Sequence, residues 1–236
     1  MDIQAVLFDL DFTLAKPGPD LGPEGYQRMG RRFGLELEPG LYKEARAKAV
    51  EGLHKHPDFR HDEEIWVAFT ERIIRGMGGN TDRAYDLAVE MTKAWEHAHN
   101  FDLFDDVPPV LENLRTHGLK LGIVSNTGRD VDEFLAHHKL RFDAALSSKV
   151  HGKVKPHPTI FQAVLDRLGV PAESAAMVGD SPEDDLEGAR ALGMTAFLVD
   201  REEVYPDRPD RLPDLFALPA ALGLSSDPSQ GTSPGS

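Results

Sequence analysis

A short apolar segment near the start of the chain constrains the fold most strongly, because it ends in two carboxylates. Ile3 to Phe8 is almost continuously apolar and rich in strand-forming residues, as expected for a strand covered on both faces. Asp9 and Asp11 follow this segment directly. Carboxylates at the end of a buried strand are costly unless a cation or a reaction partner lies between them. The segment therefore predicts a buried strand with a charged site at its carboxyl end.

The order of the predicted elements indicates the fold class. Four helical patterns follow the first strand with no convincing strand between them, at residues 23–33, 41–53, 62–76 and 81–99. Later residues alternate between strands at 119–124, 142–146, 175–178 and 195–199 and helices at 110–117, 129–138, 158–168, 183–192 and 215–222. This order predicts an α/β fold, with a doubly wound, mainly parallel Rossmann-like sheet and a helical insertion after its first strand.

Breaks in composition indicate where the parts of the chain meet. Residues 16–23 are rich in Pro and Gly, and residues 100–109 end in Val107-Pro108-Pro109, so we expect both to be irregular connections. The predicted parts are a core of residues 1–14 and 105–223, a helical cap of residues 15–104 and a disordered tail of residues 224–236.

Composition limits the classes of function. The formal net charge of −14 argues against a nucleic-acid-binding surface, and a site for an anion must supply its own positive charge. The chain contains no cysteine, so a disulfide or a thiolate zinc site is excluded. It shows no signal-peptide pattern and no apolar run near the roughly 20 residues that span a bilayer. We expect a cytoplasmic protein of unknown oligomeric state, with neither nucleic acid nor membrane as a partner.

Polar side chains follow the predicted strands, and in doubly wound sheets ligands bind outside these carboxyl ends. The side chains at these positions are Asp9, Ser125, Ser147 or Ser148, Asp180 and Asp200. Asp9 and Asp11 flank one residue, and Thr13 comes shortly after them. If Asp9 attacks a phosphoryl group, Asp11 can protonate the leaving oxygen and later activate a water.

The segment Ser125-Asn126-Thr127-Gly128 opens a predicted helix. It fits equally a turn with a hydroxyl cap and a phosphate seat built from the Ser125 hydroxyl and backbone N–H groups. A phosphate dianion also needs a cation near Asp9. Lys155, which directly precedes a proline, is the candidate, whereas Lys149 and Lys153 are expected to be surface lysines.

The segment from Gly179 to Asp185 combines a helix start with an additional carboxylate. Ser181 as N-cap and Pro182 at the first helical position explain its second half. Asp180 precedes the cap and ends a strand, as Asp9 does. Asp9, Asp180 and the carbonyl of Asp11 would form the all-oxygen site that Mg²⁺ prefers.

These four segments, in this order, resemble the motifs of the haloacid dehalogenase superfamily of phosphohydrolases. The resemblance covers residues 1–14 and 105–200. It implies that Asp9 forms an aspartyl-phosphate and that Asp11 is the general acid and base. It further implies that Asp9, the Asp11 carbonyl and Asp180 hold Mg²⁺, with Asp185 in support. The residues that would hold the phosphoryl group are Thr13, Ser125, Asn126 and Lys155.

The resemblance also extends to the insertion, which looks like the family's helical cap of the first type. Such a cap closes over the site and selects substrates. The cap residues His54, His56, Arg60 and His61 match no chemistry that the sequence defines, and Trp66 and Trp95 are expected in the core.

Three positions depart from the family pattern. Phe12 stands where similar motifs often have Gly or Asn, and it affects the shape of the adjoining turn. His157 stands where Asp is common after the Lys-Pro pair. Asp184 and Asp185 are both available in the fourth motif, and the register with similar sequences favours Asp185.

The leading hypothesis is Mg²⁺-dependent hydrolysis of a small phosphorylated metabolite. A sugar phosphomutase shares the core chemistry and remains open. A 2-haloacid dehalogenase needs neither Mg²⁺ nor a second carboxylate, so Asp11 and Asp180 argue against it. A catalytically idle scaffold should have lost a strand-end group, and the sequence retains all of them.

Overall fold

The structure, a computed structural model, describes residues 2–51 and 58–224. A six-stranded sheet has the order β5-β4-β1-β6-β7-β8, and every neighbouring pair is parallel. Its strands are β1 (Ala5–Phe8), β4 (Lys120–Ser125), β5 (Ala144–Ser147), β6 (Ala175–Gly179), β7 (Thr195–Val199) and β8 (Arg211–Leu212). The chain builds β4 and β5 on one side of β1 and then β6 to β8 on the other, so the predicted doubly wound sheet is confirmed.

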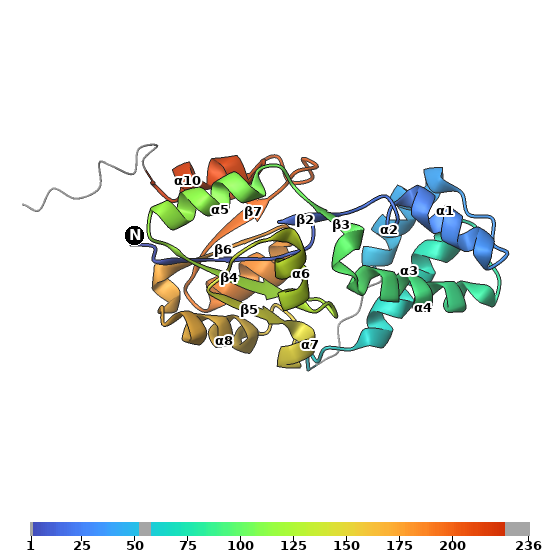
Figure 1. Cartoon of the computed structure of the whole chain (residues 1–236), viewed down its shortest axis with the longest axis horizontal. Helices are drawn as coiled ribbons and strands as arrows, with labels where there is room; N and C mark the ends of the chain where they lie inside the picture. The colour runs from blue at the N-terminus through green and yellow to red at the C-terminus, as the bar shows by residue number, and fades with distance from the viewer. Residues whose placement is uncertain (1, 52–57, 225–236) are drawn as a thin grey trace, which may run out of the picture.

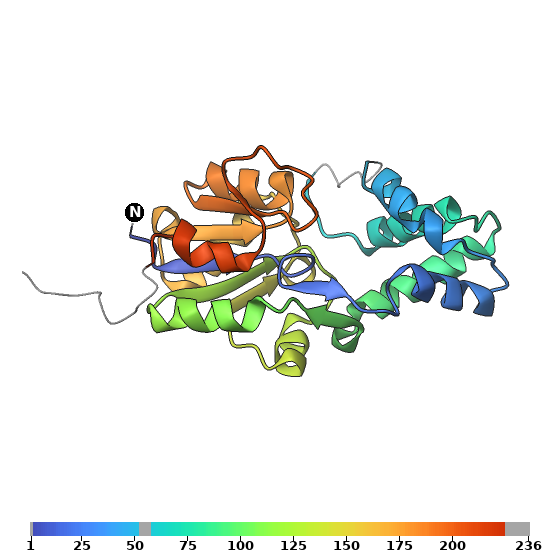
Figure 2. The same ribbon diagram turned by 90° about the horizontal axis from the view of Figure 1, so that it is seen from above.

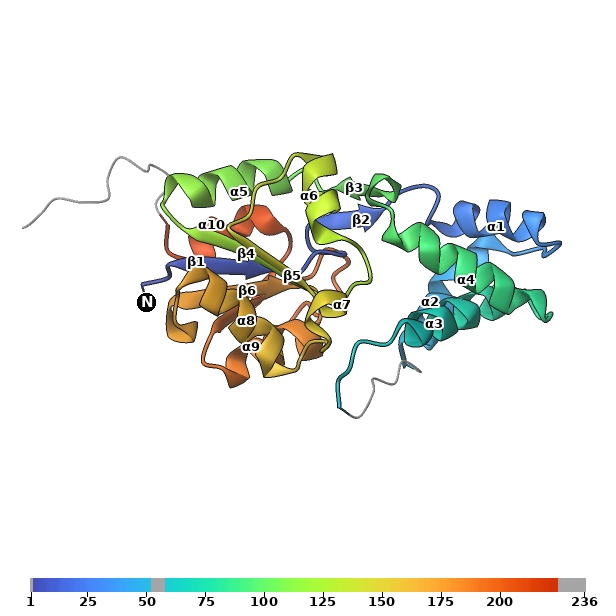
Figure 3. The same cartoon turned by 60° about the horizontal axis from the view of Figure 1, so that its bottom comes forward.

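Helices cover both faces of this sheet (Figure 1 and Figure 3). Successive side chains of a strand point to opposite faces. Val6 and Phe8 of β1 therefore pack in the core under α5 (Val107–Thr116), α6 (Val131–His138) and α10 (Leu218–Ala221). Ala5 and Leu7 pack in the other core, under α8 (Pro158–Leu168) and α9 (Gly188–Ala191).

The helical insertion lies to one side of the sheet, beyond the carboxyl end of β1 (Figure 1 and Figure 2). It contains α1 (Pro23–Arg32), α2 (Tyr42–Glu51), α3 (Glu63–Gly76) and α4 (Arg83–Glu96). Apolar side chains of the last two helices are buried, with Ile73 and Ile74 on α3 and Leu87 and Met91 on α4. An α-helical insertion is therefore confirmed, and the exact boundaries of the parts stay predictions.

The short connecting elements are α7 (Ser148–His151), the 3₁₀ turns η1 (Pro39–Leu41), η2 (Ala98–Asn100), η3 (Ala172–Ser174) and η5 (Leu215–Ala217), and the π-helical segment η4 (Pro182–Glu187). The segment η4 runs directly into α9, so the helix predicted over 183–192 is divided into two kinds of turn.

The two connections to the insertion are more ordered than the sequence indicated. β2 (Ala15–Pro17) and β3 (Phe101–Leu103) pair as antiparallel strands, β2 overlapping the start of residues 16–23 and β3 lying within residues 100–109. Three-residue strands are too short to show an alternating pattern, and their pairing joins distant segments of the chain. Helix α5 also begins at Val107 rather than at residue 110, because proline is well tolerated in the first turn of a helix.

Some predictions fall outside the described residues. His54, His56 and the expected tail from residue 225 onward belong to them. Within residues 2–51 and 58–224, no helix has the length and apolar character required to cross a membrane.

Candidate active site

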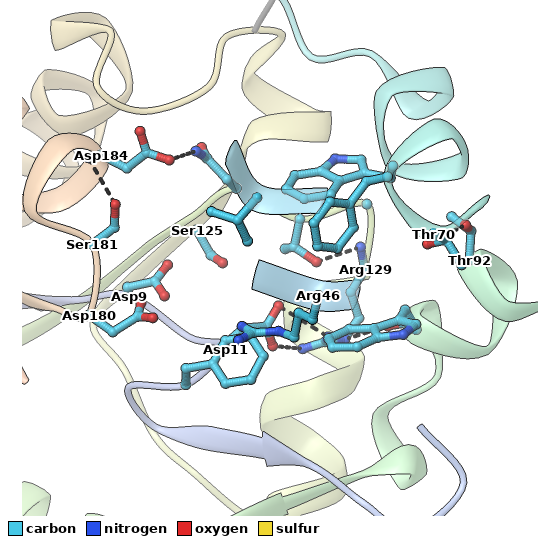
Figure 4. Close-up of a pocket in the computed structure, with 18 of the residues that line it drawn as sticks. Asp9, Asp11, Arg46, Thr70, Thr92, Ser125, Arg129, Asp180, Ser181 and Asp184 are labelled. Atoms are coloured by element: carbon cyan, nitrogen blue, oxygen red, sulfur yellow. Dashed lines mark hydrogen bonds and ion pairs between the residues drawn. The ribbon is translucent and has the colours of Figure 1, made fainter. Parts of the chain in front are cut away.

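A cavity of about 240 Å³ lies between the carboxyl ends of the strands and the helical insertion. Its floor contains the predicted site residues Asp9, Asp11, Ser125, Asn126, Lys155, Asp180 and Asp185. Its other side is formed by side chains of the insertion, several of them aromatic, and Figure 4 shows Asp9, Asp180 and Ser125 facing it from the sheet. Residues from four distant segments thus meet at one edge of the sheet.

Thr13 is the one predicted site residue that stays outside this lining. Its side chain is fully buried, and its hydroxyl has no hydrogen-bond partner in the part of the chain that the structure describes. Contact between Thr13 and a phosphoryl group remains a prediction from the sequence.

Asp9 and Lys155 form a buried ion pair at the end of β1. The backbone N–H of Asp9 donates to the Val178 carbonyl at 2.9 Å, which continues the pairing of β1 with β6. Lys155 Nζ lies 2.5 Å from Asp9 Oδ1 and 2.6 Å from Asp185 Oδ1. The three side chains are at most 9% exposed. Lys155 therefore supplies the cation that the sequence predicted beside Asp9.

Burial and mutual interaction shift the pKa values of the charged side chains at the cavity floor. Burial raises the pKa of Asp9 to about 7, with contributions from Asp185 and Asp11 and against the opposing effect of Lys155. Burial alone would lower the pKa of Lys155, but Asp185 and Asp9 outweigh it and raise that pKa above its ordinary value. Loss of water and the neighbouring Asp9 and Asp185 raise the pKa of Asp180 well above its usual range. The floor thus places three carboxyl groups beside one ammonium, and the pKa of two of them is raised.

The same carboxylates form a candidate cation site. One oxygen from each of Asp9, Asp180 and Asp185 lies within 4.8 Å of the others. Hard carboxylate oxygens are the ligands that Mg²⁺ prefers, and a bound divalent cation would favour their ionised form. The donor set therefore fits the predicted metal, and the cluster includes Asp185 rather than Asp184.

Asn126 links the Ser125 segment to the loop that carries Lys155. Its Oδ1 accepts from the Lys155 backbone N–H at 2.7 Å, and its Nδ2 donates to the Lys155 carbonyl at 3.2 Å. The same Nδ2 lies 3.3 Å from Asp184 Oδ2. The Asn126 side chain thus holds the Lys155 backbone in place.

Gly179 is required by the position of Asp185. A Cβ on Gly179 would overlap the Asp185 carboxylate, which also accepts from the Ser181 backbone N–H at 3.0 Å. We expect Gly179→Ala to displace Asp185 and to lower the free energy of unfolding by about 1–3 kcal/mol. Gly40→Ala is the matched control, because nothing lies within 4 Å of its Cβ position. Urea unfolding with equal midpoints for both variants would contradict this role of Gly179.

Phe12, in the turn after β1, has a positive φ although it is neither Gly nor Asn. Its φ of 63° places it in the left-handed region, which is strained for most side chains. Its ring lines the cavity, 4.4 Å below the Arg46 guanidinium and 6.3 Å from the ring of Trp95. Phe12 therefore adopts a left-handed conformation that Gly and Asn reach more easily, and it adds an aromatic surface to the cavity.

Arg129 is a site residue that the sequence reasoning missed. Its guanidinium contacts Asp11, with Nη1 3.0 Å from Oδ1 and Nη2 3.4 Å from Oδ2. The available signal was a basic residue directly after Ser125-Asn126-Thr127-Gly128, at the same strand end. Its partner Asp11 could not be inferred, because a long side chain in a connecting segment can turn in several directions.

The insertion also contacts the core through residues 59–61. The Val154 N–H donates to the Phe59 carbonyl at 2.8 Å, and His61 Nδ1 lies 2.8 Å from Ser148 Oγ. Arg60 forms an isolated antiparallel bridge with Lys153. Arg60 and His61 thus lie against the loop that leads to Lys155.

Other predicted polar residues have local roles. Asp200 accepts from the N–H groups of Val204 and Tyr205 and pairs with Arg211 at 2.8 Å, so it organises the loop after β7. Lys149 is 44% exposed and pairs with Glu63, as expected for a surface lysine. Trp66 and Trp95, expected in the core, both line the cavity, and Trp95 also packs against the buried core.

Comparison with protein families agrees with this geometry. The family model described as "Haloacid dehalogenase-like hydrolase" matches residues 6–199. The chain belongs to this family. The match includes the strand ends, the insertion and the loop of Lys155, so the chain is a hydrolase of the haloacid dehalogenase type.

Relatives of this haloacid dehalogenase-like hydrolase include more than one activity. A phosphoserine phosphatase of Thermus thermophilus is 30% identical over 246 residues, which cover 90% of this chain and 94% of the relative. A crystal structure of a HAD phosphatase from Thermococcus onnurineus is 28% identical with a TM-score of 0.65, over 94% of this chain and 98% of the other. A 2-haloacid dehalogenase from Pseudomonas syringae is 29% identical with a TM-score of 0.59, over the same shares.

Proposed function

We propose that the chain is a Mg²⁺-dependent phosphatase that hydrolyses a small phosphate monoester through an aspartyl-phosphate on Asp9. The observation that carries the proposal is the group of buried charges at the cavity floor. Asp9 is held by Lys155 at 2.5 Å, with oxygens of Asp180 and Asp185 within 4.8 Å of an Asp9 oxygen. The phosphatases among the relatives support a phosphate ester as substrate.

The residues have separate roles in the proposed reaction. Asp9, the Asp11 carbonyl and Asp180 would hold Mg²⁺, with Asp185 in support, and the bound ion would neutralise and orient the phosphate. Ser125, the Asn126 backbone and Lys155 would bind the phosphoryl oxygens.

The proposed reaction has two displacements at phosphorus. An Asp9 oxygen attacks phosphorus while the bond to the leaving oxygen breaks, and Asp11 gives its proton to that oxygen. Asp11, now a carboxylate, takes a proton from a water that attacks the aspartyl-phosphate. The bond from Asp9 to phosphorus then breaks, which releases inorganic phosphate and restores both carboxyl groups.

Two other activities known on this fold can be compared with the residues of the same cavity. A haloacid dehalogenase is disfavoured because Asp11 and Asp180 would have no use in it, although one structural relative has that activity. A sugar phosphomutase would use the same groups and differ in the acceptor. A cytoplasmic location and the absence of nucleic-acid or membrane partners stay predictions.

The experiment is phosphate release from a panel of sugar, nucleotide and small-acid phosphates, with Mg²⁺ or with EDTA. We expect release from at least one ester without an acceptor sugar, and a fall of at least about 10²-fold in EDTA, because a metal supplies several kcal/mol of charge stabilisation. A thermal unfolding curve in EDTA controls for loss of the fold.

Three outcomes would contradict the proposal. Chloride release from 2-chloropropionate in EDTA, without phosphate release, would indicate a dehalogenase. Phosphate transfer that occurs only with an acceptor sugar would indicate a phosphomutase. Absence of any turnover with Mg²⁺ would favour a non-enzymatic role.

A further inference from the structure

Arg129 is a buried cation that the proposed reaction does not yet use. Its side chain is 1% exposed, and it lies between β4 and α6, directly before the N-cap residue Asp130. Its backbone N–H donates to Thr127 Oγ1 at 3.1 Å, which fixes the segment that carries it. A buried charge is costly unless it is paired, so the contacts of its guanidinium are informative.

Every nitrogen of this guanidinium has a partner. Nη1 and Nη2 face the two oxygens of Asp11 at 3.0 Å and 3.4 Å, and Nε donates to the Trp95 carbonyl at 3.1 Å. The guanidinium carbon lies 3.6 Å from the ring centroid of Phe101 and 5.2 Å from that of Phe134. A planar guanidinium that is hydrogen-bonded through all three nitrogens and packed against two aromatic rings has little freedom to turn.

This rigid cation fixes the Asp11 carboxyl group, which is 20% exposed and lines the cavity (Figure 4). The two contacts differ in length, since 3.0 Å is an ordinary hydrogen bond and 3.4 Å is a long one. Oδ1 is therefore the firmly held oxygen. Oδ2, with the longer contact, is the oxygen that is freer to carry a proton while Oδ1 keeps its bond to Arg129.

We propose that Arg129 is a positioning residue that orients Asp11 for proton transfer to the leaving oxygen. The inference rests on the proposed phosphatase reaction. In that step the bond from phosphorus to the leaving oxygen breaks, and the proton on Asp11 Oδ2 moves to that oxygen. Arg129 keeps its charge and its protons throughout, and it acts only through the geometry of Asp11.

The test compares esters whose leaving groups differ in their need for a proton. An alkyl alcohol leaves as a strongly basic oxygen and needs the proton of Asp11, whereas p-nitrophenolate leaves readily without it. For Arg129→Gln we expect kcat/KM for β-glycerol phosphate to fall about 10–100-fold. For p-nitrophenyl phosphate we expect a fall of about 3-fold or less, because little proton transfer remains to be lost.

Two further variants separate positioning from folding. Arg129→Lys can still place one donor at Oδ1 and should recover part of the lost rate with β-glycerol phosphate. In an Asp11→Asn background, Arg129→Gln should cause little additional loss, because both changes remove the same step. The ratio of the two substrate rates comes from one preparation, so an unfolded fraction cancels from it.

Arg201→Gln is the matched control. Arg201 also pairs with a buried carboxylate, Asp106, at 2.8 Å and 3.0 Å, and it donates to the Thr13 carbonyl at 2.9 Å. It also lies over an aromatic ring, 3.7 Å from the centroid of Phe104. Its loss should change both substrate rates by the same factor.

The outcomes distinguish this inference from the proposed function. Wild-type hydrolysis of both esters, with equal losses in Arg129→Gln, would overturn the role of Arg129 alone. A wild-type protein that releases phosphate from neither ester, nor from the wider panel, would overturn the proposed function and this inference with it. A selective loss with the alkyl ester, absent from Arg201→Gln, is the expected result.

Discussion

Asp9→Asn is expected to abolish phosphate release, with a fall in kcat of at least about 10⁴-fold, because the variant lacks the nucleophile. The amide is nearly isosteric with the carboxylate, so the cavity should keep its shape. It also removes one negative charge from a floor where burial raises the pKa of Asp9 to about 7. The measurement is the initial rate of phosphate release at saturating Mg²⁺ with the best ester of the panel.

Asp86→Asn is the matched control for this change. Asp86 is an exposed carboxylate on α4, so its conversion to the amide should leave the rate unchanged. An Asp9→Asn protein that retains more than a tenth of the wild-type rate would show that Asp9 is not the nucleophile.

Lys155→Met is expected to have the largest effect on stability. The substitution preserves most of the side-chain volume and leaves Asp9 and Asp185 buried without their cation. Breaking a buried pair in this way costs about 3–5 kcal/mol, and for a chain of this size the unfolding midpoint should fall by about 6–20 °C. Loss of a charge that would bind the phosphoryl group should also lower kcat by about 10²–10³-fold.

The conditions and the control make this prediction specific. The fall in the unfolding midpoint of Lys155→Met should be larger in EDTA than with Mg²⁺. A cation bound at Asp9 and Asp180 would offset part of the positive charge that the variant has lost. Lys149→Met removes an exposed pair with Glu63 and should cost less than about 1 kcal/mol. Equal midpoints for Lys155→Met and the wild type in EDTA would mean that Lys155 does not stabilise the buried carboxylates.

The fold could be predicted from the sequence where the pattern is local. The apolar run before Asp9 and the alternation after α5 each reflect burial of a whole element, so the parallel sheet and the helical insertion followed from them. The pairing of β2 with β3 could not be predicted. Their hydrogen bonds join residues such as Lys16 and Asp102, and no local period records such a contact.

The candidate site likewise has features that could be predicted from the sequence and features that could not. Asp9, Ser125 and Asp180 could be placed together because parallel strands deliver their carboxyl ends to one edge of the sheet. The contact between Arg129 and Asp11 depends on a side-chain direction, and the need for Gly179 depends on the space that Asp185 occupies. Such contacts are set by packing, which is visible only once the elements have been assembled.

Two tryptophans of the helical insertion have surroundings that the sequence pattern does not define. Aromatic residues at helical spacing usually fill a core, which is why Trp66 and Trp95 were expected there. The helices of the insertion instead face the strand ends across a cavity, so part of their apolar surface lines it. Whether a tryptophan packs in a core or lines a cavity depends on how the helices are placed, which the helical period does not encode.

The central claim is a covalent phosphoryl group on Asp9, and acid quenching during turnover tests it directly. Wild-type protein and Asp11→Asn are mixed with Mg²⁺ and excess phosphate ester, quenched in acid and measured by mass spectrometry of the intact chain and its peptides. The account predicts the added mass of one phosphoryl group on the peptide that contains Asp9, and none in Asp9→Asn. Continued phosphate release by the wild type with no such adduct, or an adduct that persists in Asp9→Asn, would contradict it.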